Sequence, residues 1–309
     1  MQGSKYVPPR ATTATGGRDT MRPRMTERDN SSNAGPSNAE AMAARPGAPE
    51  LSPPELSVTE LSVPELSVVV PVHDEAANIG PLIAEIDAAL GGRIEFEIVY
   101  VDDGSGDASA EELARARRRH PRLKVLRHRA QCGQSAALGT GIAAARAEWI
   151  ATLDGDGQND PADILPLVEA RDESGDPNLR MIAGVRRKRR DSLFRRLSSR
   201  IANAVRRRVL RDATTDTGCG LKLFRREAYL ALPAFDHMHR FLPALIKRGG
   251  GAVLEVPVGH RPRRAGASHY GMLNRTWIGL VDMLGVAWLQ RRMKIPVVEE
   301  PGLEEMDES

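Results

Sequence analysis

A pair of carboxylates separated by one glycine is the feature of this chain best suited to chemistry. Asp154 and Asp156 follow the apolar run at residues 149–153, which is typical of a buried strand. Two carboxylates one residue apart share a face of an extended chain, and their repulsion costs free energy unless a cation offsets it. Mg²⁺ and Mn²⁺ prefer oxygen ligands, often carboxylates together with substrate phosphates. The spacing therefore predicts a metal–diphosphate site; the alternative is an acidic turn in which Asp160 caps a helix starting at Pro161.

Two further apolar runs also end in acidic residues. Residues 95–101 are followed by Asp102 and Asp103, and residues 66–72 are followed by a polar loop that contains Glu75. Helical patterns alternate with these runs, and this order predicts an α/β fold with a parallel sheet. In such a sheet the carboxyl ends of the strands share one edge, where ligands bind. We therefore expect the three acidic loops to line one polar cleft.

Taken in order, these motifs resemble glycosyltransferase family 2, whose members use nucleotide sugars and have the GT-A fold. The resemblance rests on residues 70–75, 101–105, 133–141 and 153–161. Later segments resemble the polyprenyl-phosphate, dolichol-phosphate mannosyltransferase-like branch of the family: residues 216–226, 239–243 and 258–271. The similarity runs from about Leu66 to Leu289, and it implies a Rossmann-like α/β domain with a mostly parallel sheet.

The resemblance also implies roles for individual residues. Contacts to the nucleotide sugar are expected from Pro71, His73, Glu75, Asp102, Asp103, Asp154 and Gln158. A divalent cation, Mg²⁺ or Mn²⁺, would stabilise charge on the leaving nucleoside diphosphate, and its expected ligands are Asp154, Asp156 and Gln158. An acceptor phosphate needs cationic and polar groups around it, and the family positions imply Arg240, Arg261, Arg263 and Ser268. The expected catalytic residues are Asp156, Asp216 and Arg240.

The reaction implied is transfer of a sugar from a UDP- or GDP-linked donor to polyprenyl phosphate, with inversion at the anomeric carbon. A phosphate is already anionic at neutral pH, so it needs no strong general base. The alternative is a family 2 enzyme that acts on a saccharide hydroxyl in cell-envelope polysaccharide synthesis, with Asp216 as the base. A non-catalytic, membrane-bound scaffold is a third interpretation, and the intact acidic motifs argue against it.

Composition divides the chain into four parts. Residues 1–65 lack apolar periodicity, and three tandem copies of a Pro/Thr-Glu-Leu-Ser-Val pentapeptide begin within them, the third of which (64–68) runs into the first expected strand. We interpret them as a disordered region with a semi-extended linker and without the apolar segment of a signal peptide. A start codon upstream of the true gene start would explain the region equally well. The other parts are a glycosyltransferase domain at 66–270, an amphipathic helix at 271–295 and an acidic tail at 296–309.

Positive charge is concentrated at residues 186–211, which hold twelve Lys or Arg residues and one acid. We expect a basic amphipathic helix there, because apolar residues recur every three or four positions: Leu193, Phe194, Leu197, Ile201, Val205 and Val209. It could lie on an anionic membrane, bind nucleic acid, or pack on the sheet with solvated arginines. Nucleic acid is the least expected partner, because base-stacking aromatic residues are nearly absent nearby.

The apolar run at residues 276–289 is interrupted by Asp282 and is too short to cross a bilayer. Trp277, Leu284 and Trp288 fall on one helical face, and tryptophan is suited to the membrane–water interface. We therefore expect a peripheral protein at the cytoplasmic face of the cell membrane. A membrane-protein partner could provide firmer anchoring.

The two cysteines, Cys132 and Cys219, lie far apart and outside any zinc-ligand pattern, so zinc and redox roles are not expected. We expect Cys219 to be a small buried residue. Gly133 and Gly141 are expected to serve turns and close packing rather than phosphate binding.

Overall fold

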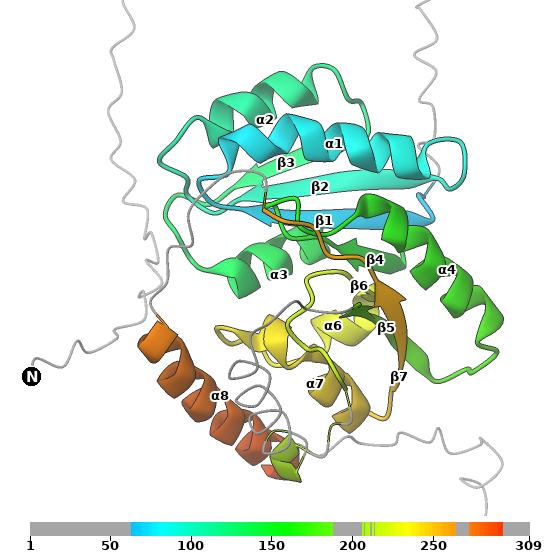
Figure 1. The fold of residues 1–309 in the computed structure, drawn as a ribbon, viewed down its shortest axis with the longest axis vertical. Helices are drawn as coiled ribbons and strands as arrows, with labels where there is room; N and C mark the ends of the chain where they lie inside the picture. Colours follow the sequence, from blue (N-terminus) through cyan, green and yellow to red (C-terminus); the bar gives the residue numbers. More distant parts are fainter. Residues whose placement is uncertain are drawn as a thin grey trace, which may run out of the picture. The chain divides into compact units, whose positions relative to one another are not determined.

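A computed structural model of the 309-residue chain describes residues 63–187, 206, 208–210, 212, 214–263 and 272–292 (Figure 1). All of these residues belong to one compact unit, Val58–Ser309. Some expectations fall outside the described residues and stay predictions. They concern the low-complexity region before residue 63, most of the basic amphipathic segment, Ser268 and the acidic tail.

A seven-stranded sheet lies at the centre of the unit, with strands in the order β3-β2-β1-β4-β6-β5-β7. The strands are β1 (Leu66–Val72), β2 (Phe96–Asp102), β3 (Leu123–Arg127), β4 (Trp149–Thr152), β5 (Leu179–Arg186), β6 (Lys222–Arg225) and β7 (Ala252–Val258). β6 runs antiparallel to β4 and β5, whereas the other neighbouring strands are parallel. The expected α/β fold with a mostly parallel sheet is therefore confirmed.

Helices cover both faces of the sheet (Figure 1). One face is covered by α1 (Ala76–Leu90), α2 (Ser109–Arg117) and α4 (Ile164–Glu173). The opposite face is covered by α3 (Gln134–Ala144), α6 (Arg226–Leu230) and α7 (Leu242–Arg248). Further helical elements are the 3₁₀ turns η1 (Pro161–Asp163) and η2 (Met238–Arg240) and the long α8 (Met272–Arg292). The Asp160 side chain accepts a hydrogen bond from the Ala162 N–H at 3.0 Å, so the expected cap is present at η1.

Side chains of the central strands point alternately to the two faces of the sheet, which explains why an apolar core lies on each face. Val68 and Val70 of β1 belong to the cluster under α1, whereas Val69 belongs to the cluster under α3. Successive side chains of a strand point to opposite faces, so a strand covered on both sides is largely apolar. Gly141 lets α3 approach the sheet closely, because a β-carbon there would lie 2.5 Å from Val69 Cγ1. Its expected role in close packing is thus confirmed.

The reversed direction of β6 decides which loops meet beyond the end of β4. Lys222 pairs with Thr152, the last residue of β4. The chain that enters β6 therefore passes beside the acidic loop that leaves β4. The Thr152 hydroxyl donates a hydrogen bond to the Gly220 carbonyl at 2.7 Å, which fixes this approach.

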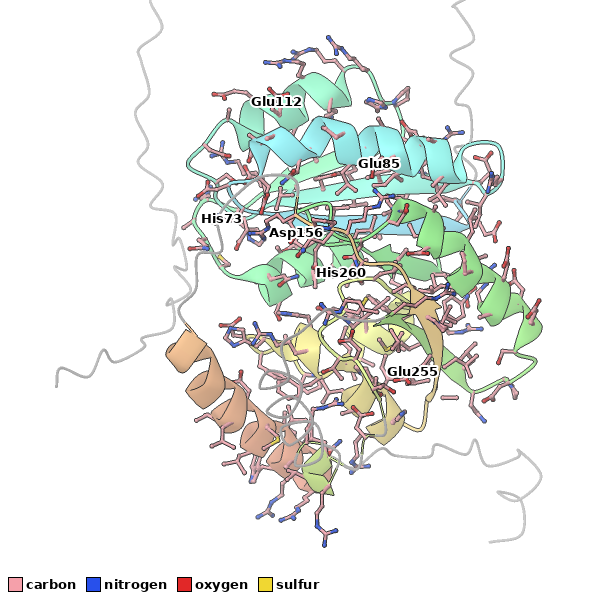
Figure 2. All side chains as sticks on the ribbon, viewed as in Figure 1. His73, Glu85, Glu112, Asp156, Glu255 and His260 are labelled. Atoms are coloured by element: carbon pink, nitrogen blue, oxygen red, sulfur yellow. The ribbon has the colours of Figure 1, made fainter. Side chains whose placement is uncertain are left out.

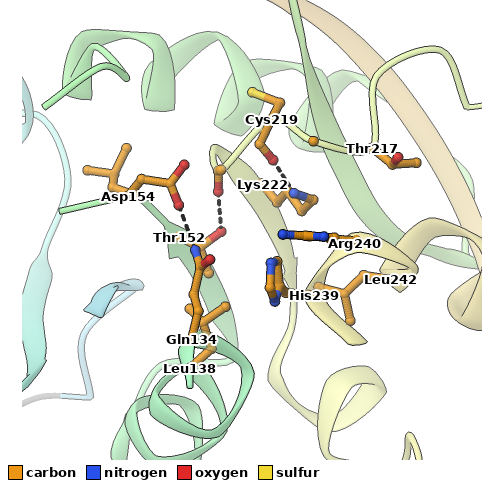
Figure 3. A pocket seen from close by; sticks show the side chains of 13 residues that line it. Gln134, Leu138, Thr152, Asp154, Thr217, Cys219, Lys222, His239, Arg240 and Leu242 are labelled. Carbon is orange, nitrogen blue, oxygen red and sulfur yellow. Dashed lines mark hydrogen bonds between the residues drawn. The ribbon is translucent and has the colours of Figure 1, made fainter. Parts of the chain in front are cut away.

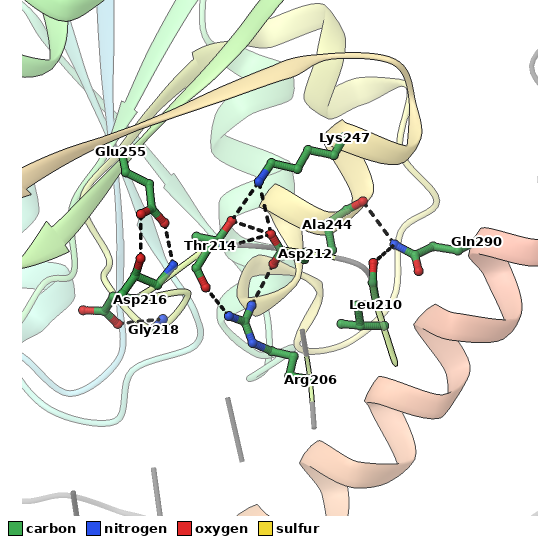
Figure 4. Close-up of polar contacts among 11 residues, drawn as sticks. Arg206, Leu210, Asp212, Thr214, Asp216, Gly218, Ala244, Lys247, Glu255 and Gln290 are labelled. Atoms are coloured by element: carbon green, nitrogen blue, oxygen red, sulfur yellow. Dashed lines mark hydrogen bonds and ion pairs between the residues drawn. The ribbon is translucent and has the colours of Figure 1, made fainter. Parts of the chain in front are cut away.

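α8 packs on the unit through one side and exposes apolar residues on another. Met283 and Val286 are buried in a cluster with Leu210 and Phe241. Gln290 Nε2 donates hydrogen bonds to the carbonyl oxygens of Leu210 at 3.2 Å and Ala244 at 3.3 Å (Figure 4). The large apolar side chains that α8 exposes, by 41 % to 60 % of their surface, are Leu280, Val281, Leu284 and Trp288. No described helix combines the length and the apolar character that crossing a membrane requires.

Candidate active site

The acidic loops after β1, β2 and β4 lie at one edge of the sheet, as the sequence predicts. Parallel pairing aligns β1 with both β2 and β4. Figure 2 shows His73, which follows β1, and Asp156, which follows β4, at this edge. His73 Nδ1 forms a hydrogen bond with the carbonyl oxygen of Asp103 at 2.9 Å, so the loops after β1 and β2 are tied together.

Asp154 occupies a partly buried position two residues after the end of β4. Gln134 Nε2 donates a hydrogen bond to Asp154 Oδ1 at 2.8 Å, and Gly220 lies against the same carboxylate (Figure 3). Burial and the negative charge of Asp156 raise the pKa of Asp154, although the Lys222 ammonium opposes this rise. A cation bound beside Asp154 would therefore stabilise its ionised form.

Asp156 is paired with an arginine from the segment after β7. Its Oδ2 accepts hydrogen bonds from Arg263 Nη2 at 3.1 Å and Nε at 3.3 Å, and its Oδ1 accepts one from the Gln158 backbone N–H at 3.1 Å. Arg263 Nη2 also lies 3.5 Å from Glu75 Oε1. Burial raises the pKa of Glu75, and the charge of Arg263 offsets only part of this rise. Arg263 is thus a shared counter-charge for two carboxylates.

The residues after β4 fit a hard divalent cation. Asp154 and Asp156 supply carboxylate oxygens, and their mutual repulsion is one cause of the raised pKa of Asp154. Gln158 Nε2 donates a hydrogen bond to the Arg261 carbonyl at 3.3 Å, so its amide oxygen is the atom suited to bind a cation. Carboxylate and amide oxygens are typical ligands of Mg²⁺ and Mn²⁺. These three side chains could therefore hold one ion.

A cavity of about 140 Å³ opens beside Asp154 (Figure 3). Lys222 from β6, and His239 and Arg240 from η2, line the cavity across from Asp154. Within the described part of the chain, Arg240 forms no ion pair with a carboxylate. The cavity thus places an acidic side opposite a basic side. This arrangement suits a ligand that carries a metal-bound group and a second, anionic group.

Lys222 is almost completely buried in the cavity wall. Burial lowers the pKa of its amine, although the charge of Asp154 opposes this effect. Its Nζ donates a hydrogen bond to the Cys219 carbonyl oxygen. Cys219 is itself buried, as expected, and burial raises the pKa of its thiol. An anion in the cavity would favour the charged form of Lys222.

His239 is uncharged over the physiological pH range. Burial, together with the positive charges of Lys222 and Arg240, lowers the pKa of His239 to about 3. Its Nδ1 lies 2.8 Å from Ser135 Oγ, which accepts a hydrogen bond from the His239 backbone N–H at 3.4 Å. Since Ser135 Oγ accepts the bond from the backbone N–H, we assign the hydroxyl proton of Ser135 to the bond with His239 Nδ1, which then accepts it. This tautomer carries its proton on Nε2 and can donate there to a ligand.

Asp216 is held by a two-point ion pair with Arg186. The distances are 2.6 Å from Nε to Oδ2 and 2.7 Å from Nη2 to Oδ1. Burial opposes the charge of Arg186, but these bonds outweigh it and raise the pKa of the guanidinium. Asp216 Oδ1 also accepts a hydrogen bond from the Gly218 N–H at 3.2 Å, which forms a local turn (Figure 4). Both oxygens of this expected catalytic residue are therefore engaged.

Asp103 fixes the loop that leads into α3. Its carboxylate accepts hydrogen bonds from the backbone N–H groups of Cys132 at 2.8 Å and Gly133 at 2.7 Å. His128 Nδ1 lies 2.7 Å from Oδ1, and His128 Nε2 lies 2.9 Å from Thr140 Oγ1. Burial alone would raise the pKa of Asp103, but these bonds outweigh it and lower the pKa. Asp103, His128 and Cys132 are close enough to hold a metal ion, yet their hydrogen bonds already account for their arrangement.

The other residues expected near the nucleotide support the same two loops. Pro71 lies inside β1, and Asp102 is the buried last residue of β2. Asp102 Oδ1 accepts a hydrogen bond from the Ser105 N–H at 2.9 Å, and Asp102 Oδ2 lies 3.1 Å from Arg127 Nε. Contacts of these residues with a donor stay predictions.

Arg261 holds the segment after β7 along the acidic loop. Its Nη1 lies 2.9 Å from Glu85 Oε2, and its Nη2 pairs with Asp160. Its backbone N–H donates a hydrogen bond to the Gln158 carbonyl at 2.9 Å. The guanidinium is thus tied to carboxylates away from the cavity, whereas Arg263, two residues later, reaches Asp156.

The model for glycosyl transferase family 2 matches residues 67–232, more than half of the chain. The chain belongs to glycosyl transferase family 2.

This family 2 chain is similar to two kinds of curated transferase. It is 36 % identical over 232 residues to the dodecaprenyl-phosphate galacturonate synthase of Rhizobium johnstonii, covering 72 % of this chain and 67 % of that protein. It is 34 % identical over 208 residues to the undecaprenyl-phosphate 4-deoxy-4-formamido-L-arabinose transferase of Edwardsiella ictaluri, covering 67 % and 63 % of the two chains. The chain therefore spans about two thirds of the length of these relatives.

Solved structures share the fold of this family 2 chain. A mannosyltransferase from Pyrobaculum calidifontis, solved with GDP-mannose and Mn²⁺, aligns with a TM-score of 0.56 and 23 % identity over 75 % of this chain and 66 % of its own. The mannosyl-3-phosphoglycerate synthase of Rubrobacter xylanophilus aligns with a TM-score of 0.57 and 20 % identity over 79 % of each chain. These likenesses support the GT-A fold.

Several residues of the site, among them Lys222, His239 and Arg186, are not among the residues expected from the sequence. Lys222 could have been recognised as a lone charge between the apolar residues Leu221 and Leu223. His239 stands next to Arg240 in the segment 239–243, which carries part of the resemblance to the family. The sequence around Arg186 does not indicate a role in the site, because the residue pairs with Asp216, a carboxylate thirty positions away.

Proposed function

We propose that the chain is an inverting, metal-dependent glycosyltransferase that moves a sugar from a UDP- or GDP-linked donor to a polyprenyl phosphate. The names of the two curated relatives support this acceptor class. The observation that carries the proposal is the cavity in which Lys222 and Arg240 lie across from Asp154. Donor diphosphate and acceptor phosphate would then occupy opposite sides of one site.

On the donor side, Asp154, Asp156 and Gln158 would hold Mg²⁺ or Mn²⁺. When bound, the ion supplies positive charge to the leaving nucleoside diphosphate. Gln134 keeps the Asp154 carboxylate in place through its 2.8 Å hydrogen bond. The loops fixed by His73 and Asp103 would receive the nucleoside, together with Glu75.

On the acceptor side, the chain offers charge rather than a base. Arg240 would bind the phosphate, and Lys222 would add a second positive charge at the same wall. His239, held neutral, would donate a hydrogen bond from Nε2. Arg263 would also reach the acceptor once a cation replaces it at Asp156, whereas Arg261 would keep the segment in position.

A saccharide hydroxyl is the second candidate acceptor. Such an acceptor must lose a proton during transfer, and Asp216 is the residue expected to accept it. Such a base must have an oxygen available to accept a proton. Both Asp216 oxygens are engaged by Arg186, at 2.6 Å and 2.7 Å. This pairing favours the phosphate acceptor, whose nucleophilic oxygen is already ionised.

We further propose that the protein works as a peripheral protein on the cytoplasmic face of the cell membrane. The exposed apolar residues of α8, ending in Arg291 and Arg292, fit the boundary between headgroups and acyl chains. A membrane-protein partner would strengthen this attachment. In a flotation experiment with anionic liposomes, we expect the full chain to float with the liposomes and Leu284→Glu to float less. Unchanged flotation of that variant would show that the exposed apolar face of α8 does not contact the membrane.

Transfer from a panel of radiolabelled UDP- and GDP-sugars to polyprenyl phosphate in liposomes tests the proposal. We expect lipid-extractable product from one donor in the presence of Mn²⁺ or Mg²⁺. Metal-dependent nucleotide binding without any lipid product would overturn the acceptor assignment and favour a saccharide. Failure to bind any nucleotide sugar would favour a non-catalytic scaffold.

A further inference from the structure

A second, apolar groove lies next to the cationic cavity. It has a volume of about 460 Å³ and is formed between α3, α6 and η2. It is lined in part by the polar residues Cys132, Ser135 and Asp236, but mainly by apolar and aromatic side chains: Ala136, Tyr229, Leu230, Leu232, Phe235 and Met238. Leu230 is exposed by 44 %, so the groove is open to its surroundings. The proposed donor and phosphate contacts use none of these six residues.

The groove and the cavity share one wall. Consecutive residues of α3 divide between them, since Gln134 lines the cavity and Ser135 lines the groove. The same division occurs at η2, where Met238 faces the groove and His239 faces the cavity. The 2.8 Å hydrogen bond between Ser135 and His239 joins the two sides of this wall. A ligand with a charged end and an apolar end could therefore occupy both.

The groove also adjoins the helix that exposes apolar side chains. Leu232 and Phe235, which line the groove, pack against the cluster that contains Met283 and Val286 of α8. His237, which directly precedes η2 and stands between the groove residues Asp236 and Met238, pairs with Asp282 of α8 at 3.1 Å. The groove is thus connected by direct packing to the helix whose outer residues would meet a lipid surface.

We propose that this groove binds the first isoprene units of the acceptor, while the acceptor phosphate lies in the cationic cavity. The inference rests on the proposed function, because it assigns the prenyl chain of that acceptor to a defined surface. The groove is mainly apolar, the cavity beside it has a basic side that includes Lys222 and Arg240, and residues of α3 and η2 form the wall between the two. An isoprenyl phosphate has the same order of parts, an apolar chain joined directly to an anion.

The inference predicts how affinity depends on chain length. Each methylene removed from water favours binding by roughly fourfold. Affinity should therefore rise steeply from isopentenyl to geranyl to farnesyl phosphate, and it should level off once the groove is filled. A site that recognises the phosphate alone would bind all three equally.

The decisive variant is Ala136→Phe in the full chain. Ala136 is exposed on α3, so a larger side chain can be accommodated by extending into the groove. Ala84→Phe, at an exposed position of α1, is the matched control. Leu230→Lys is a second variant that makes the groove less apolar without adding bulk to α3.

Binding of isopentenyl, geranyl and farnesyl phosphate should be measured by calorimetry with Mn²⁺ and UDP or GDP present. We expect Ala136→Phe and Leu230→Lys to weaken farnesyl phosphate binding at least tenfold and to leave isopentenyl phosphate and nucleotide binding unchanged. Equal affinities for farnesyl phosphate in Ala136→Phe and Ala84→Phe would overturn the inference. If the protein bound none of the prenyl phosphates, both the assignment of the prenyl chain to the groove and the proposed function would be overturned. If neither groove variant changed sugar transfer to long prenyl phosphates, the assignment of the prenyl chain to the groove would be overturned, and the proposed function would stand.

Discussion

Gly220 lies so close to Asp154 that a β-carbon at residue 220 would overlap the Asp154 carboxylate. The closeness follows from the direction of β6, whose first residue, Lys222, pairs with the end of β4. Gly220 therefore allows the loop before β6 to close over the carboxylate that we assign to the metal. The proposed metal site thus depends on a residue that carries no functional group.

Gly220→Ala should weaken binding of Mn²⁺ with UDP or GDP by at least tenfold, because the new methyl group displaces Asp154. Gly80→Ala is the matched control, since a β-carbon at that exposed position of α1 meets nothing within 4 Å. Isothermal titration of the nucleotide with and without Mn²⁺ measures the effect. Wild-type affinity in Gly220→Ala would show that Asp154 is not needed in its present position.

Arg263→Gln should strengthen Mn²⁺–nucleotide binding by up to about fivefold, the range for removing a partly exposed ion pair. The reason is that the guanidinium and the cation compete for Asp156 Oδ2, which lies 3.1 Å from Arg263 Nη2. Electron paramagnetic resonance of free Mn²⁺ measures this competition without any turnover.

The same variant should raise the KM for the acceptor, because it removes a cation proposed to reach the phosphate. Arg93→Gln, at an exposed position before β2, is the matched control. Weaker Mn²⁺ binding in Arg263→Gln would contradict the competition and would indicate that Arg263 supports the metal site.

Asp216→Asn should lower the free energy of unfolding by about 3 kcal/mol, since it leaves the largely buried Arg186 guanidinium without its counter-charge. Arg186→Gln should have a similar effect, and the double variant should cost less than the sum of the two. Denaturant unfolding of the four proteins measures the coupling.

Activity separates this structural role of Asp216 from a general base. The ion-pair interpretation predicts comparable losses of kcat in Asp216→Asn and Arg186→Gln. A general base would make the first loss 10²-fold or larger while Arg186→Gln stayed active. That second outcome would restore the saccharide acceptor.

His239 should make the protein less stable in acid. Its pKa is lowered to about 3 in the folded state, against an ordinary value of 6.5. Between these values the unfolded chain binds a proton that the folded chain does not, so stability falls as the pH drops below about 6.5. The wild type should therefore lose about 2 kcal/mol more than His239→Gln between pH 8 and pH 5. Urea midpoints at the two pH values measure this difference, and equal losses would show that His239 titrates normally.

Much of the fold could be predicted because buried parallel strands are continuous apolar runs. The runs at residues 66–72 and 95–101 correspond closely to β1 and β2. The antiparallel direction of β6 could not be predicted in the same way. Strand direction depends on pairing with distant strands, and a four-residue segment carries no local sign of it.

The acidic half of the candidate site was predictable, whereas its internal pairing was not. Asp154 and Asp156 stand out by spacing alone, since repulsion between neighbouring carboxylates needs a cause. The pairing of Arg186 with Asp216 joins residues thirty positions apart, and the hydrogen bond of Ser135 with His239 spans 104 positions. Only the folded chain brings these partners together.

The most direct test of the central claim compares two acceptors in liposomes, polyprenyl phosphate and the corresponding polyprenol, with the labelled donor identified from the panel. We predict transfer to the phosphate alone, lost on chelation of the divalent cation and in Asp156→Asn. The result follows because the cationic wall binds an anion, and because Arg186 engages both oxygens of Asp216, the candidate base for a hydroxyl. Equal transfer to the polyprenol, or full activity of Asp156→Asn, would contradict the account.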